Sequence, residues 1–282
     1  MKKKQIPLLL ALFSLSIFFA CNNTEDSSLI SDELIESSDT TIAETTNYNP
    51  QALFKLPSPV ELFIFMWEDG VEFDIENINS IENTQKYIDT KKKALNLGVY
   101  SADLAYCTVY DRNQETMNLF SASKVIAEDL GLTEGFDKSI LIRIDKNLDN
   151  SDSLYQITND SYSKTLTFLQ AQGQTKILPY IIYGGWVESV YIATQSIKKY
   201  KESSEIALRI SDQGMLLDNI IDFFVSISEK EQAEKEQAII DQLTELQKTY
   251  DKIYDSEEGT MSKEYFQEVK TQIAILRNEI VK

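Results

Sequence analysis

The sequence predicts an all-α protein, an irregular multi-helix bundle of roughly eight to ten helices that ends in an αα-hairpin. Three observations support this prediction. In most segments beyond residue 58 the apolar residues recur every three or four positions, which is the spacing of a helix face. Glycine, proline and capping residues separate these segments from one another. No pair of neighbouring segments shows the apolar and polar alternation that is typical of paired strands.

The first helix is predicted from Val60 to about Glu68. Ser58 and Pro59 precede it and form a good pair for the N-cap and the first helical position. Gly70 is expected to end it. Because its residues are apolar on nearly every side, we expect this helix to be buried.

An acidic link over residues 71–80 leads to a second predicted helix, from about Ile81 to Asn96, which Gly98 interrupts. The following segment, Val99 to Tyr110, has nine apolar or aromatic residues in twelve, and Asp103 is its one charged residue. This composition indicates a central helix that is wrapped by others.

Five further helical segments are predicted from apolar spacing and capping residues. They cover about Gln114–Leu130, Thr133–Ile144, Leu154–Gln170, Thr175–Tyr200 and Ser204–Ser226. The short run 140–144 within the second of them could also be a strand. In the fourth, the small residues Gly184, Gly185 and Ser189 allow another backbone to approach closely. Glycine costs roughly 1 kcal/mol relative to alanine inside a helix, so a contact or a ligand should compensate.

The last two segments have the most regular pattern of the chain. Their apolar residues step alternately by three and four positions, which is the spacing of coiled-coil packing. The residues of the two stripes are Ile239, Leu243, Leu246, Tyr250 and Ile253, then Phe266, Val269, Ile273, Leu276 and Ile280. We therefore expect one helical domain at 51–282 that ends in an αα-hairpin over 239–282, with the hairpin either as a semi-independent part or as part of the same body.

Residues 1–20 have the organisation of a signal peptide. Three lysines from Lys2 on precede the apolar run Ile6–Phe19, and Ala20 stands before Cys21. A transmembrane anchor is the less favoured alternative, because a spanning helix needs about 20 apolar residues. The stretch resembles the lipobox of bacterial lipoproteins. That resemblance implies a lipid such as palmitate on Cys21 and attachment to the outer membrane, on its periplasmic side or at the cell surface.

Residues 21–50 are predicted to be a disordered acidic tether, because they are rich in Ser, Thr, Asp and Glu and contain no Lys or Arg. The net charge of the whole chain is −18. It becomes −21 when the signal peptide is removed together with its three lysines. Such a charge makes nucleic acid and anionic lipid surfaces unfavourable partners.

The chain contains no histidine, which excludes Ser-His-Asp and Cys-His triads and the usual zinc and di-iron sites. Glycine-rich nucleotide-binding motifs are absent as well, so we expect no cofactor. Asp145, Asn147 and Asp149 match the first oxygen positions of a calcium-binding EF-hand loop. However, Asn150 stands where glycine is needed and Gln156 where glutamate is needed, which favours a capping loop over a metal site.

Two carboxyl groups are the strongest candidates for chemistry. Glu188 is followed by Ser189, as in the helical lytic transglycosylases, where a single glutamate acts as general acid. The Gly-Leu-Met-Gln motif of those enzymes does not follow. Asp103 lies in an apolar helix, where a buried carboxylate costs several kcal/mol unless it is hydrogen-bonded. It can therefore be a polar clasp between helices or a ligand-binding acid.

Four short blocks of sequence resemble a set found in uncharacterised helical lipoproteins of Bacteroidota. The blocks are LPSP at 56–59, LGVYSADLAY at 97–106, NSDSL at 150–154 and GGWVESVY at 184–191. The resemblance spans about residues 53–225 and implies a lipoprotein with an all-α fold, but no activity. If the blocks share a binding site, its expected members are Asp103, Tyr106, Trp186 and Glu188.

These observations together favour a non-enzymatic binding module of the cell envelope, which takes a protein partner or a small ligand. Two alternatives remain open at this point. One is a structural or adhesion protein that acts through its C-terminal hairpin. The other is a peptidoglycan-cleaving enzyme that uses Glu188.

Overall fold

The computed structural model describes residues 59–132, 176–202, 204–228, 233–256 and 260–282, with scattered positions between 139 and 172. In these residues every regular element is a helix, so the predicted all-α fold is confirmed. The described part has seven α-helices and two short 3-10 helices, and it belongs to one compact unit. Cys21, the signal peptide, the tether and most of the two helices predicted between 133 and 170 lie outside the described residues.

Helix α1 (Pro59–Glu68) begins and ends close to its predicted bounds. Gly70 has a φ of 73°, a left-handed conformation that glycine adopts without strain, and it ends the helix as expected. Phe63 and Met66 are completely buried, but Trp67 is 59% exposed. The expectation of burial therefore holds for the inner face of α1 and is wrong at Trp67.

Helix α2 (Thr90–Val109) differs from the prediction in both its start and its course. The residues before it form two 3-10 helices, η2 (Ile75–Asn77) and η3 (Ile81–Lys86). Helix α2 starts only after Asp89, whose side chain accepts a hydrogen bond from the Lys92 amide at 2.8 Å. It then continues through Gly98, where the sequence pattern suggested a break.

Gly98 is inside the helix because it lies against the backbone of helix α6 (Leu178–Ser196). A Cβ atom on Gly98 would lie 2.0 Å from the carbonyl oxygen of Ile181. On the other side, a Cβ on Gly184 would lie 2.0 Å from the carbonyl oxygen of Leu95. The close approach predicted at Gly184 and Gly185 is thus a helix–helix contact, and the glycine of α2 is its counterpart.

The remaining long helices cover or extend this central pair. Helix α3 (Asn113–Asp129) packs on α2, and helix α7 (Glu205–Ser228) packs on α1 and α6. Gly131, with a φ of 74°, follows α3 as predicted. Helix α6 is buried on nearly all sides, because α1, α2, α7 and a C-terminal helix all contact it.

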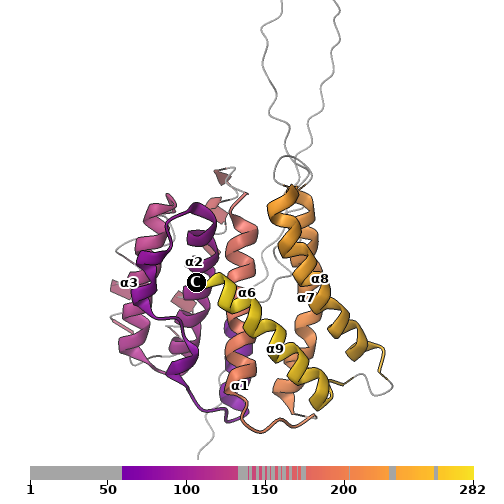
Figure 1. Ribbon diagram of the computed structural model, residues 1–282. Helices are drawn as coiled ribbons and strands as arrows, with labels where there is room; N and C mark the ends of the chain where they lie inside the picture. Colours follow the sequence, from indigo (N-terminus) through magenta and orange to yellow (C-terminus); the bar gives the residue numbers. More distant parts are fainter. Residues whose placement is uncertain are drawn as a thin grey trace, which may run out of the picture. The chain divides into compact units, whose positions relative to one another are not determined.

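The C-terminal hairpin consists of α8 (Ala233–Tyr254) and α9 (Lys263–Ile280). Both predicted apolar stripes are buried. Helix α8 packs on α7, whereas α9 packs on α6 and touches α2 near its C-terminal end (Figure 1). The hairpin therefore presents its apolar stripes to the body of the protein.

Candidate functional site

The structure brings two of the four candidate residues together between α2 and α6. Asp103 extends from α2 and Glu188 from α6, and both side chains have no exposed surface. Their carboxyl groups are within hydrogen-bonding reach of each other. The contact at Gly98 and Gly185 sets this arrangement, because it holds the two helix backbones together within two turns of both carboxyl groups.

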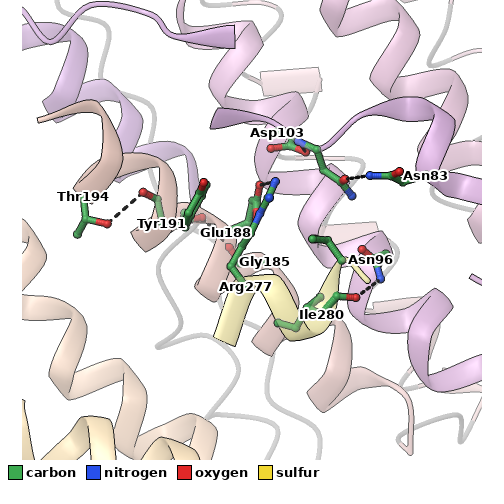
Figure 2. Close-up of polar contacts among 12 residues, drawn as sticks. Asn83, Asn96, Asp103, Gly185, Glu188, Tyr191, Thr194, Arg277 and Ile280 are labelled. Carbon is green, nitrogen blue, oxygen red and sulfur yellow. Dashed lines mark hydrogen bonds and ion pairs between the residues drawn. The ribbon is translucent and has the colours of Figure 1, made fainter. Parts of the chain in front are cut away.

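Arg277 of α9 completes the cluster, as Figure 2 shows. Its Nε donates to Oε2 of Glu188 at 3.1 Å, and its Nη2 donates to Oε1 at 3.2 Å. This two-pronged pairing matches the planar guanidinium to the planar carboxylate. The guanidinium also lies 4.6 Å from the ring centre of Tyr191. The Arg277 side chain is 13% exposed, whereas the Glu188 side chain to which it is bonded has no exposed surface.

Asp103 is held differently from Glu188. Its Oδ2 accepts a hydrogen bond from the Asn79 amide at 3.0 Å, while its Oδ1 receives no donor among the described residues. Burial raises the pKa of Asp103 well above its ordinary value, and the charge of Glu188 raises it further. The Asn79 amide opposes this shift only in part.

One proton on Asp103 accounts for these contacts. Burial raises the pKa of Glu188 as well, but the adjacent guanidinium of Arg277 opposes that shift. Because Glu188 receives two charged donors and Asp103 a single amide, the proton belongs on Asp103. A protonated Asp103 carboxyl group can donate a hydrogen bond to Glu188, and with Arg277 the cluster is then neutral as a whole. A buried site with two carboxylates and one cation would carry an uncompensated charge.

Tyr106 lies on the same helix but belongs to a different contact. Its hydroxyl accepts a hydrogen bond from the Asp74 amide at 2.9 Å. Its ring stacks on Phe73 at 4.9 Å between centroids and packs on Phe63 at 5.2 Å. Tyr106 therefore fastens the link between α1 and α2 onto the core.

Trp186 also lies away from the carboxyl pair. It precedes Glu188 by two residues, which places the two side chains about 200° apart around the helix. The residue is 7% exposed, and its indole nitrogen has no acceptor among the described residues. The four residues suggested by the sequence blocks therefore do not lie in one place. Asp103 and Glu188 form a pair, Tyr106 belongs to a separate contact, and Trp186 points to another side of α6.

Sequence reasoning missed the partners that come from other elements. Arg277 follows Ile273 by four positions and precedes Ile280 by three, so it lies at the edge of a buried stripe. A single basic residue at the edge of an apolar stripe was the signal in the sequence that could have indicated this contact. Asn96 was missed too, and its side chain donates to the Ile280 carbonyl at 2.9 Å (Figure 2). Nothing in the sequence indicated that Asn79 would meet Asp103.

The cluster is closed to solvent, because neither carboxyl group has exposed surface. Among the described residues, no group of three or more His, Cys, Asp or Glu side chains is arranged to hold a metal ion.

Of the calcium-like loop, Asp145 and Asp149 lie outside the described residues, and Asn150 accepts a hydrogen bond from the Ser153 amide at 2.9 Å. That contact has the geometry of a capping interaction. Cys107 is fully buried, and burial raises the pKa of its thiol.

No helix in the described part of the chain combines the length and apolar character needed to cross a membrane. Comparisons with protein-family models, with curated proteins and with solved structures gave no match.

Proposed function

We propose that this chain is a lipid-anchored protein of the cell envelope whose helical body is a non-enzymatic binding module for a protein partner or a small ligand. In this proposal the lipid on Cys21 attaches the chain to the outer membrane, and residues 21–50 are the tether. The burial of Asp103 and Glu188 is the observation that supports a non-enzymatic role. Both carboxyl groups have no exposed surface and are bonded within the protein, so neither faces a substrate.

The contacts of Glu188 do not favour the peptidoglycan-cleaving alternative. A general acid of a glycosidase has to be protonated and must reach the oxygen of the scissile bond. Glu188 is instead fully buried, and both of its oxygens accept hydrogen bonds from Arg277 of α9. A peptidoglycan-cleaving enzyme would therefore need a different catalytic residue, and the sequence suggests none.

The packing of the hairpin also bears on the adhesion alternative. A helix-in-groove contact uses an exposed apolar stripe, but the stripes of α8 and α9 are buried in the protein itself. A partner would therefore contact the outer surface of the body. Trp67 is a good starting point there, because it is 59% exposed and tryptophan is enriched among residues that dominate binding energy.

Metabolic labelling with a palmitate analogue tests the anchor. We expect the wild-type chain to be labelled and to fractionate with the outer membrane. The Cys21→Ser variant should be unlabelled and released as a folded protein. A Cys21→Ser chain that remains bound to the membrane would contradict the anchoring proposal.

Crosslinking in intact cells tests the binding function. We expect one discrete crosslinked product with the wild type, which weakens with Trp67→Ala and persists with Met215→Ala, an equally exposed control at 58%. Protease treatment of the same cells shows which face of the outer membrane carries the body. Cleavage of peptidoglycan by the wild type, lost in Glu188→Gln, would replace the binding proposal by the enzymatic one.

A further inference from the structure

We propose that helix α9 is a proton-linked latch: it stays docked on α2 and α6 while Asp103 and Glu188 hold one proton between them, and loss of that proton favours its release. The three groups concerned come from three different helices. Asp103 lies on α2, Glu188 on α6 and Arg277 on α9. Helix α9 thus supplies the only cation in contact with the pair among the described residues.

The latch is built at the boundary between the buried pair and the solvent. Asp103 and Glu188 have no exposed surface, whereas the Arg277 side chain retains 13% exposure. Undocking of α9 would remove the guanidinium and admit water to both carboxyl groups. Hydrated carboxyl groups ionise near their ordinary pKa, so the undocked state releases the proton that the docked state retains.

The other titratable groups that face the pair keep their protons. Tyr87 comes from the link before α2, and Tyr100 and Cys107 come from α2 itself. Burial raises the pKa of each of these groups, so all three remain neutral where carboxyl groups titrate. Asp103 is therefore the group in this cluster whose charge changes.

The remaining contacts of α9 do not involve a carboxyl group of the cluster. Asn96 donates to the carbonyl of Ile280 at 2.9 Å, and Lys270 donates to the carbonyl of Thr194 at 3.0 Å. Burial lowers the pKa of Lys270, so its deprotonation could also weaken docking at alkaline pH. A Lys270 variant is therefore needed as a control.

The sign of the effect follows from counting protons. The pKa of Asp103 is raised in the docked state, so the contribution of Asp103 to docking is fully present below its ordinary value of 3.8. Above that value the undocked state binds one proton fewer than the docked state. The docking constant then falls up to tenfold per pH unit, until the pH passes the raised pKa of the docked state.

Hydrogen exchange of backbone amides, followed by mass spectrometry, tests the latch in the full chain. After correction for the intrinsic pH dependence of exchange, the protection of α9 should fall by up to tenfold per pH unit above about pH 4. Protection of α3, which contributes no side chain to the cluster, should change less. Asp103→Asn should abolish the pH dependence of α9, because an amide mimics the neutral acid. Lys270→Met should preserve it.

Two results would overturn the proposal. One is protection of α9 with the same pH dependence in the wild type and in Asp103→Asn. The other is loss of protection in α3 and α9 together, which would link the proton to global unfolding and not to undocking. Should Asp103→Asn fail to fold, infrared spectroscopy of the wild type at neutral pH replaces it. A carbonyl band of a buried protonated carboxyl group is expected, and its absence refutes the latch.

Discussion

Removing both acidic groups of the cluster should destabilise the protein by more than the two single changes together. Asp103→Asn replaces a neutral acid by a neutral amide of the same shape, so we expect the free energy of unfolding to fall by less than about 1 kcal/mol. Glu188→Gln removes the ion pair with Arg277, at 3.1 and 3.2 Å. Asp103 can then ionise and compensate part of the charge, which limits the loss to about 1–3 kcal/mol.

In the double variant no carboxyl group remains to balance Arg277. Leaving one charge of a buried pair without its partner costs about 3–5 kcal/mol. We therefore expect a coupling of about 0.5–3 kcal/mol, in the sense of extra destabilisation. Such a loss would be a large part of the 5–15 kcal/mol by which native proteins are stable.

Urea unfolding of the four proteins at neutral pH, with circular dichroism as the probe, measures these free energies. Equal slopes of the transitions are required before midpoints are compared. Additivity within about 0.5 kcal/mol would refute the one-proton assignment, because independent groups add in that way. The triple variant that also carries Arg277→Met should recover part of the stability, since it removes the unbalanced charge.

Two further predictions compare matched pairs of variants by urea unfolding. Gly184→Ala should lower the free energy of unfolding by about 3 kcal/mol or more, because its Cβ would lie 2.0 Å from a backbone oxygen. Gly131→Ala has open space around it and should cost about 1–2 kcal/mol, because its backbone is in the left-handed conformation. Equal costs would show that α2 and α6 can separate freely. Tyr250→Phe should be neutral or stabilising, because this buried hydroxyl has no partner among the described residues. Tyr100→Phe should cost about 1 kcal/mol, because it removes a 2.7 Å hydrogen bond to the Ser80 carbonyl. A larger loss for Tyr250→Phe than for Tyr100→Phe would contradict this reasoning.

The sequence predicted what depends on local pattern. Helix α3, the termination of α1 at Gly70 and both stripes of the hairpin follow from spacing and capping, which act within a few residues. The same rules failed at Gly98. A glycine that breaks a helix and a glycine that admits a neighbouring backbone have the same sequence signal, and only the position of α6 distinguishes them.

The candidate site was predictable in part for a related reason. A lone acid in an apolar helix identifies Asp103, and Glu188 was noticed from its neighbours in sequence. Their partnership depends on the packing of α2 on α6, and their counter-charge Arg277 is 89 residues away from Glu188 along the chain. Pairings over such distances leave no periodicity in the sequence. Tyr106 makes its contacts away from this pair and Trp186 points to another side of α6, because shared sequence blocks do not imply a shared helix face.

The position of Arg277 also has a consequence for the order in which the protein assembles during synthesis. It lies 89 residues beyond Glu188 along the chain, so the ribosome makes α2 and α6 well before this cation exists. Until then, close packing of α2 on α6 would bury two acidic groups without compensation. The incomplete chain is thereby discouraged from forming its central contact early. A polypeptide whose central contact depends on a helix made this much later remains easy to keep unfolded until α9 has been synthesised.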